Sequence, residues 1–131
     1  MKALYDTCIY IDFLRSGKHS DLLSDRSQFR YLSPVVILEL MAGAHRPIQQ
    51  KALDRLFLPY SKAARIVRLD PNHHYKAGQC LASLRGPTSK GLSHDVLIAV
   101  SALSIGATLF TSNRSDFEKI RRNVPFKVEY V

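Results

Sequence analysis

Short apolar runs alternate with longer amphipathic stretches along the whole chain. The apolar runs predict strands, and they cover Lys2–Tyr5 and residues 31–32, 66–69, 108–111 and 126–131. The stretches between them carry apolar residues at helical spacing, as Ile9, Phe13 and Leu14 do in the first one. This order of strands and helices predicts an α/β domain with a largely parallel sheet.

Local signals predict where several helices begin and end. Ser33 and Asp70 each precede a proline, which is typical of a capping side chain followed by proline in the first helical turn. Ser93 and Ser115 are expected to cap two later helices, and Gly106 is expected to end the first of these.

Composition narrows the class of protein and its compartment. A length of 131 residues with 46% apolar residues favours one packed domain over residues 1–131. No apolar run approaches the roughly 20 residues of a membrane span. Asp6 also interrupts the apolar segment that a signal peptide would need. We therefore expect a cytoplasmic protein without membrane contact, in which Cys8 and Cys80 are reduced, buried packing residues.

The chain is strongly basic, with 19 Lys and Arg residues against 11 Asp and Glu residues and a formal net charge of +8. A cationic surface attracts polyanions because binding releases their condensed counterions, so nucleic acid is the first partner to consider. An acidic partner protein fits the same charge, and excess charge can also serve solubility alone.

Four acidic residues lie in apolar surroundings, where charged side chains are rare. Asp6 follows the first strand, and Asp116 follows the turn after a later one. Glu39 lies within the most apolar stretch of the chain, and Asp95 lies in the first turn of an apolar helix. Each has a structural explanation when taken singly, such as the favourable position of an aspartate at a helix N-terminus. Ligands of parallel sheets bind beside the carboxyl ends of the strands, and the alternating topology brings all four residues to that edge.

Carboxylates that share one edge need a counter-ion. Two such charges about 5 Å apart repel by roughly 3 kcal/mol at an effective dielectric constant near 20. Hard oxygen ligands suit Mg²⁺ or Mn²⁺, which bind substrate phosphates, lower the pKa of a bound water and neutralise charge in a transition state. Zinc is disfavoured because no set of His and Cys residues has zinc-ligand spacing. The predicted chemistry is phosphodiester hydrolysis.

The same residues lie in motifs that resemble those of a known family. The segment Leu-Tyr-Asp-Thr-Cys-Ile-Tyr-Ile-Asp-Phe-Leu, which contains Asp6, resembles the opening motif of PIN-domain nucleases. The segments Ser-Pro-Val-Val-Ile-Leu-Glu-Leu with Glu39 and His-Asp-Val-Leu-Ile-Ala-Val-Ser-Ala-Leu with Asp95 resemble the second and third motifs. Thr-Leu-Phe-Thr-Ser-Asn-Arg-Ser-Asp-Phe, with Asp116, resembles the fourth. The motifs come in the family's order and span nearly the whole chain.

The size of the chain is similar to that of VapC-type toxins of type II toxin–antitoxin pairs. The resemblance implies a PIN-like three-layer sandwich with about five parallel strands, and a Mg²⁺-dependent endoribonuclease that cuts RNA. It also implies a homodimer and a cognate antitoxin, encoded alongside, that blocks the site. Cys8 departs from the pattern, since many relatives carry a polar residue such as asparagine there.

Each acidic residue receives an expected role. Asp6, Asp95 and Asp116 are the expected metal ligands, directly or through water. Glu39 is either a ligand or a base that orients the attacking water. Thr111 and Asn113 are expected to hydrogen-bond a metal-bound water or to hold Asp116, with formation of the turn after the strand as the alternative. Thr7 is expected to have a similar supporting role, with capping of the first helix as its alternative.

Basic residues beside the same edge are the candidates for phosphate binding. Arg85, Lys90 and Arg114 flank the loops expected there and are predicted to hold RNA phosphates, which positions a substrate without selecting its sequence. Asp12, six residues beyond Asp6 on a helix, should point away from the site. His94 is favoured as a plain helix-start residue, with substrate contact as its alternative.

Other functions fit parts of the sequence. The same fold could serve a housekeeping RNA-processing nuclease, or an RNA- or protein-binding module without catalysis. An aspartyl phosphotransferase with Asp6 as nucleophile is disfavoured, because Cys8 stands where a second aspartate is expected. RNA cleavage that depends on a divalent cation and on the four acids would distinguish either kind of nuclease from a binding module and from a phosphotransferase.

Overall fold

The computed structural model describes residues 1–84, 89 and 91–131. Its sheet contains four strands, β1 (Lys2–Tyr5), β2 (Phe29–Tyr31), β3 (Thr108–Thr111) and β4 (Lys127–Tyr130). They lie in the order β2-β1-β3-β4, and every neighbouring pair is parallel. The carboxyl ends of β1 and β3 are therefore adjacent at one edge, with Tyr5 paired to Phe110.

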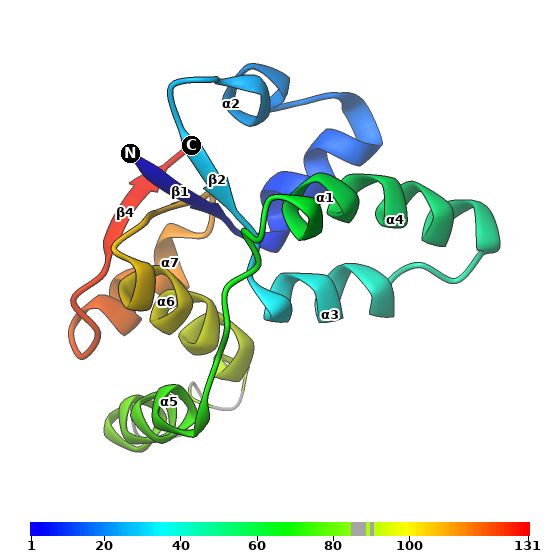
Figure 1. Cartoon of the computed structure of the whole chain (residues 1–131). Helices are drawn as coiled ribbons and strands as arrows, with labels where there is room; N and C mark the ends of the chain where they lie inside the picture. The colour runs from blue at the N-terminus through cyan, green and yellow to red at the C-terminus, as the bar shows by residue number, and fades with distance from the viewer. Residues whose placement is uncertain (85–88, 90) are drawn as a thin grey trace.

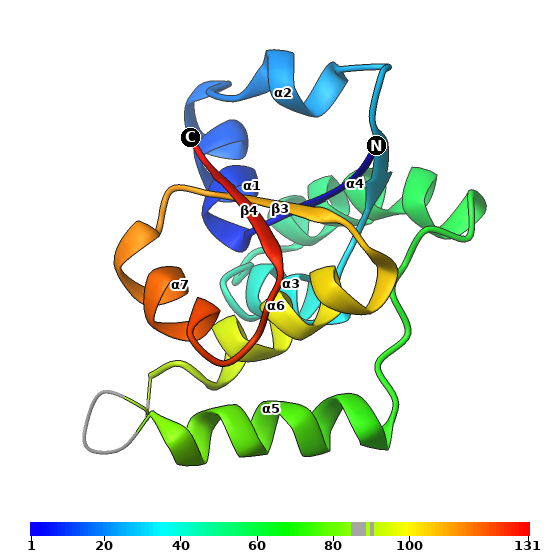
Figure 2. The ribbon, with the colours of Figure 1, turned by 90° about the vertical axis from the view of Figure 1, so that its left-hand side faces the viewer.

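Seven helices accompany the sheet in the part of the chain that the structure describes. They are α1 (Thr7–Ser16), α2 (Ser20–Ser24), α3 (Pro34–Ala42), α4 (Pro47–Lys62), α5 (Pro71–Ser83), α6 (Ser93–Ile105) and α7 (Arg114–Arg121). Figure 1 shows α1, α3 and α4 on one side of the sheet and α5, α6 and α7 on the other. Figure 2 shows α5 as the outermost element of its side, beyond α6. The predicted α/β class and the three-layer sandwich are confirmed.

The expected count of about five strands is too high by one. The run at residues 66–69 forms a single parallel bridge, between Ile66 and Leu32. Leu32 N donates to the Arg65 carbonyl at 2.9 Å, and Val67 N donates to the Leu32 carbonyl at 2.9 Å. Pairing stops there because the chain turns into α3 directly after Leu32, and Pro34 has no N–H to continue a ladder.

Two predicted helix starts are confirmed. Ser33 Oγ accepts a hydrogen bond from Val35 N at 3.2 Å, and Pro34 occupies the first turn of α3. Asp70 Oδ1 accepts from His73 N at 3.1 Å, and α5 begins at Pro71. Gly106 ends α6 at a φ of 67°, a left-handed conformation that costs glycine little.

Two predicted caps are wrong. Ser93 lies inside α6, and the first helical bond runs from Val96 N to the carbonyl of Leu92 at 2.8 Å. Leu92 is buried, so packing and not a side-chain cap sets this start. Asn113 caps α7 in place of Ser115, because its side-chain oxygen accepts from Asp116 N at 3.3 Å.

The core fixes the sheet edge at which β1 and β3 end. Tyr5 and Phe110 are buried at these ends and their rings stack 5.4 Å apart. Leu4 and Leu109, one residue earlier on each strand, are fully buried. Side chains that follow these strands therefore start from a rigid base. Among the described residues, no helix has both the length and the apolar character needed to cross a membrane.

Candidate metal and nucleic-acid site

Asp6 is held at the carboxyl end of β1 by three hydrogen-bond donors. Its own N–H donates to the Phe110 carbonyl at 3.0 Å, which ties it to β3. Asp6 Oδ1 accepts from Thr7 N at 2.8 Å, and Oδ2 accepts from Thr111 Oγ1 at 2.7 Å and from Cys8 Sγ at 3.4 Å. The residue is only 5% exposed. This burial raises the pKa of Asp6, while the three donors oppose the rise.

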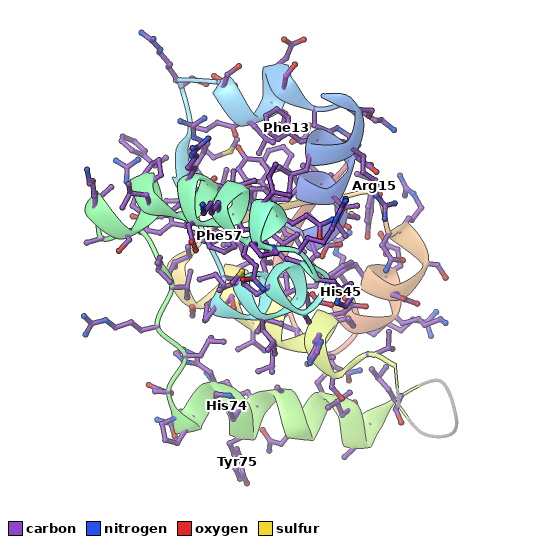
Figure 3. The ribbon with its side chains drawn as sticks, turned by 90° about the vertical axis from the view of Figure 1, so that its right-hand side faces the viewer. Phe13, Arg15, His45, Phe57, His74 and Tyr75 are labelled. Atoms are coloured by element: carbon purple, nitrogen blue, oxygen red, sulfur yellow. The ribbon has the colours of Figure 1, made fainter. Side chains whose placement is uncertain are left out.

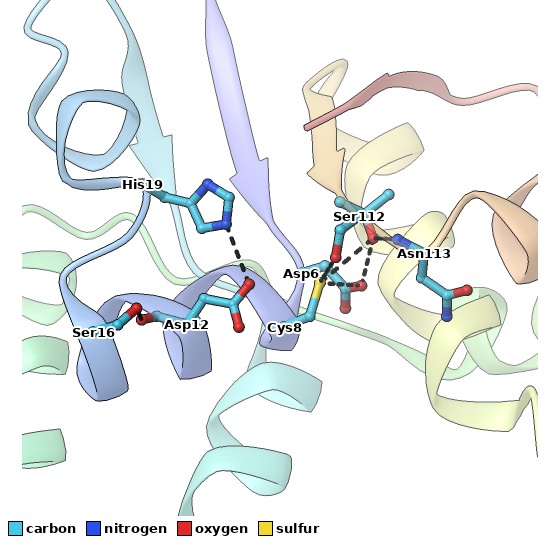
Figure 4. Close-up of polar contacts among 8 residues, drawn as sticks. Asp6, Cys8, Asp12, Ser16, His19, Ser112 and Asn113 are labelled. Atoms are coloured by element: carbon cyan, nitrogen blue, oxygen red, sulfur yellow. Dashed lines mark hydrogen bonds and ion pairs between the residues drawn. The ribbon is translucent and has the colours of Figure 1, made fainter.

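Cys8 is part of this polar arrangement, which corrects its prediction as a packing residue. Its thiol donates to Asp6 and accepts from Ser112 Oγ at 3.3 Å, as Figure 4 shows. The side chain is half-buried, whereas Cys80 is buried as expected. Burial and the neighbouring Asp6 charge both raise the pKa of the Cys8 thiol, so it stays protonated and able to donate.

Glu39 comes to the site from α3. Thr7 Oγ1 donates to Glu39 Oε1 at 2.7 Å, and His94 Nδ1 lies 3.5 Å from Glu39 Oε2. The sequence favours His94 as a plain helix-start residue, and only its position beside Asp95 indicates a role in the site. Both oxygens of Glu39 thus have a partner, and the two partners come from α1 and α6.

Asp116 stands in the first turn of α7. Asn113 Nδ2 donates to Asp116 Oδ2 at 3.0 Å, and Asn113 N donates to Thr111 Oγ1 at 3.0 Å. The structure therefore places Asn113 against Asp116, and it places Thr111 against Asp6. The turn after β3 supports two acids through these two side chains.

Asp95 shows that the four acids share one electrostatic site. Its pKa is raised to about 7, first by burial and then by the negative charges of Asp6, Asp116 and Glu39. The carboxyl group of Asp95 thus interacts electrostatically with all three others, although the four residues come from segments far apart in the sequence. We call Asp6, Glu39, Asp95 and Asp116 the acidic site. His94 is the one basic side chain that lies within ion-pair distance of it among the described residues.

The acidic site suits a hard divalent cation in donor chemistry and charge, but it is not a closed cage. Among the described residues, no three His, Cys, Asp or Glu side chains converge closely enough to hold an ion between them. The predicted three-carboxylate cluster is therefore open in this structure, as mutual repulsion of the carboxylates favours. Mg²⁺ is commonly bound through one or two carboxylates and several waters, so an open set of this kind fits it.

The other predicted residues lie in three different situations. Arg114 is exposed beside the site, and its guanidinium stacks 4.2 Å above the Tyr130 ring. Arg85 and Lys90 lie outside the described residues. Asp12 points away from the acidic site, toward His19 Nε2 at 3.3 Å (Figure 4), as its helical spacing predicts.

The fold and the acidic site together define a class of protein. The PIN domain family model matches residues 3–123, and the chain belongs to that family. It is also similar to Ribonuclease VapC1 of Rickettsia felis, with 31% identity over 124 residues and 92% of each chain covered. The predicted resemblance to PIN-domain nucleases of the VapC type is thereby confirmed.

Solved structures with the same fold come from VapBC complexes. One is VapBC2 from Rickettsia felis bound to a DNA fragment from their promoter, with a TM-score of 0.72 and 23% identity, covering 100% of this chain and 99% of that one. Another is VapBC-1 from nontypeable Haemophilus influenzae, with a TM-score of 0.73 and 20% identity, covering 99% and 98%. These similarities establish the fold over the length of the chain.

Proposed function

We propose that this protein is a Mg²⁺- or Mn²⁺-dependent endoribonuclease that hydrolyses RNA phosphodiester bonds, within a single PIN-like nuclease domain over residues 1–131. The observation that supports it best is the position of Asp6, which is only 5% exposed at the carboxyl end of β1 and, among the described residues, receives hydrogen bonds from uncharged donors alone. Its charge, with those of Glu39 and Asp116, also raises the pKa of Asp95 after the effect of burial. Such clustering costs stability unless a cation balances it, and it is typical of functional sites.

The residues of the acidic site divide into two roles. Asp6, Asp95 and Asp116 hold the cation, directly or through water. A bound divalent cation lowers the pKa of a coordinated water and neutralises charge on the phosphate. Glu39, held by Thr7 and His94, either adds a ligand or accepts a proton from the attacking water. Thr111, Cys8 and Asn113 orient the carboxylates of Asp6 and Asp116.

The biological setting follows from the relatives. The curated relative is named a ribonuclease, and the structural neighbours are complexes of a VapC with its VapB. We propose that this chain is the toxin of such a pair, acting in the cytoplasm as a homodimer and neutralised by an antitoxin encoded alongside. The net charge of +8 supports RNA as the substrate, and Arg114, together with Arg85 and Lys90, is proposed to bind its phosphates.

The test is RNA cleavage by purified protein with Mg²⁺ or Mn²⁺. Asp6→Asn keeps the size of the side chain and is expected to lower the cleavage rate at least about a hundredfold. Asp12→Asn is the matched control, because Asp12 contacts His19 outside the acidic site, and it should cleave like the parent protein. Undiminished cleavage in excess chelator, or by Asp6→Asn, would contradict the proposal that the acidic site cuts RNA, whereas RNA binding without any cleavage would favour a binding module.

A further inference from the structure

An apolar groove adjoins the acidic site and is lined by residues of α1, α3 and α4. Glu39 lines the groove and belongs to the acidic site as well. Leu40 and Leu53, both buried, form part of its wall, and Ala52 of α4 lines it from an exposed position. The groove has a volume of about 340 Å³, within the range of sites that hold small planar ligands.

One polar group in the groove has a fixed orientation. The side-chain oxygen of Gln49 accepts two backbone hydrogen bonds, from His45 N at 3.0 Å and from Arg46 N at 3.1 Å. These bonds determine which end of the amide is which, and they leave the Nε2 donor without a partner among the described residues. Gln49 therefore presents a hydrogen-bond donor where its side chain lines the groove.

The lining of the groove has one cationic side chain, Arg15, and one acidic side chain, Glu39. Arg15, at the end of α1, lines the groove, and no described carboxylate forms an ion pair with it. Figure 3 shows Arg15 and His45 on the same side of the molecule. An arginine without an acidic partner, beside an apolar wall and a carboxylate site, suits a ligand with an anionic group and a planar apolar body.

We infer that this groove is a nucleobase subsite, which takes an unstacked base of single-stranded RNA next to the bond to be cut. The inference rests on the proposed ribonuclease function. The base enters against Leu40, Leu53 and Ala52, and Gln49 Nε2 donates to an acceptor on the edge of the base. Arg15 binds a phosphate of the same strand. Proteins recognise RNA sequence chiefly through such splayed bases, so the groove gives the enzyme a preference at one position beside the cut.

The test is sequencing of new 5′ ends after digestion of a random-sequence RNA pool with Mn²⁺. The unmodified protein should show a base preference at one position next to the cut. Ala52→Leu fills the groove from an exposed helical position and should abolish that preference. Ala82→Leu makes the same change on the exposed side of α5 and should retain it. The unmodified protein should cut a substrate that is abasic at the preferred position about tenfold more slowly than the intact substrate. Ala52→Leu should cut the abasic and the intact substrates at equal rates, because its groove is already filled.

Gln49→Glu supplies a second variant. The carboxylate still accepts the two backbone bonds at the start of α4 but has no donor, so the base preference should change while the fold is kept. Gln79→Glu, on the exposed side of α5, is the charge-matched control.

Three outcomes would overturn the subsite. An identical base preference in Ala52→Leu and Gln49→Glu would exclude the groove from RNA recognition. Unchanged cleavage by Ala52→Leu combined with lost neutralisation by the co-encoded protein would assign the groove to a protein partner. If the unmodified protein cuts no RNA at all, the proposed function fails, and the subsite fails with it.

Discussion

The acidic site and the tyrosine cluster, made of Tyr5, Tyr10 and Tyr60, both bury polar groups, but they satisfy them differently. In the tyrosine cluster the hydroxyls of Tyr10 and Tyr60 lie 3.0 Å apart, and Tyr5 donates to Gln28 Oε1 at 2.7 Å. Burial raises the pKa values of all three phenols, so they are neutral and their hydrogen bonds are complete within the protein.

The acidic site has the same kind of neutral donors but lacks charge balance. Thr111, Cys8 and Thr7 satisfy oxygens of Asp6 and Glu39, yet they bring no positive charge. A half-exposed histidine, His94, is the one basic side chain within ion-pair distance of any of the four acids among the described residues. The protein itself completes the hydrogen bonds of the tyrosine cluster, whereas it leaves the acidic site short of cations, and this difference supports the proposal that the acidic site binds a cation.

The largest expected effect concerns Glu39, whose role is open. Glu39→Gln should lower kcat/KM about a hundredfold or more, because general base catalysis and metal ligation each contribute at least that much. Mn²⁺ affinity and the pH–rate profile separate the two roles. If Glu39 is the base, Glu39→Gln should bind Mn²⁺ with unchanged affinity and lose the acidic limb of the pH–rate profile. If Glu39 is a ligand, the variant should bind Mn²⁺ more weakly. Asp54→Asn, on the exposed side of α4, is the control and should keep full activity. An equal loss of activity in Asp54→Asn would mean that the effect of Glu39→Gln is not specific to the acidic site.

The next effect is a gain in stability without metal. Folded Asp95 keeps its proton up to a pKa of about 7, whereas the unfolded chain releases it near 3.8. The folded state therefore binds more protons between these values, and stability from this group falls as pH rises through that window. Asp95→Asn removes this fall. Its gain in free energy of unfolding over the unmodified protein should therefore be larger at pH 8 than at pH 5, by roughly 1–2 kcal/mol after a discount for solvent screening of this partly exposed group.

Denaturant unfolding at pH 5 and pH 8 in chelator measures this difference between the two proteins. An equal pH dependence in Asp95→Asn and the unmodified protein would mean that Asp95 does not feel the other three acids in solution.

A smaller effect is expected in the tyrosine cluster. Tyr60→Phe removes the partner of a fully buried hydroxyl on Tyr10, which should lower the free energy of unfolding by about 1 kcal/mol. RNA cleavage at saturating Mn²⁺ should be unchanged. The double variant Tyr10→Phe/Tyr60→Phe should lose less than the sum of the single variants, since no unpaired hydroxyl remains. A strong loss of cleavage in Tyr60→Phe would contradict the claim that the tyrosine cluster serves the fold and not the reaction.

The smallest effect concerns Cys8 as a positioning residue for Asp6. Cys8→Ala removes the thiol donor and should weaken Mn²⁺ binding a few-fold, about 1 kcal/mol. Cys8→Ser keeps a donor to Asp6 and an acceptor for Ser112, so it should restore the affinity. Titration of Mn²⁺ against both variants measures this, and equal weakening in the two would show that Cys8 acts by packing instead.

Much of the fold could be predicted because its signals are local. The apolar run Lys2–Tyr5, the cap and proline at Ser33 and the stop at Gly106 each appear within a few residues of sequence. The apolar run at residues 66–69 predicts a strand but forms only one bridge, because the run itself does not show whether a neighbouring strand is available for pairing. The short helix α2 has five residues and no apolar periodicity long enough to detect.

The sequence predicts the acids of the candidate site and the supporting residues Thr7, Thr111 and Asn113, but it does not predict the contacts that join distant segments. Acids in apolar surroundings are visible in the sequence, and the charges of the other three acids raise the pKa of Asp95. The donor from Thr111 to Asp6 joins residues 105 positions apart, and the approach of His94 to Glu39 joins α6 to α3. Such contacts depend on how the elements pack, and no local pattern determines them.

Binding of Mn²⁺ to the RNA-free protein, followed by electron paramagnetic resonance, tests the central claim most directly. We predict saturable binding at pH 8 that weakens at least about tenfold in Asp6→Asn, and that weakens at pH 6 because Asp95 becomes protonated below its pKa of about 7. Asp12→Asn should bind as the unmodified protein does. Absence of binding, or equal affinity in Asp6→Asn and Asp12→Asn, would contradict the account of the acidic site as a cation site.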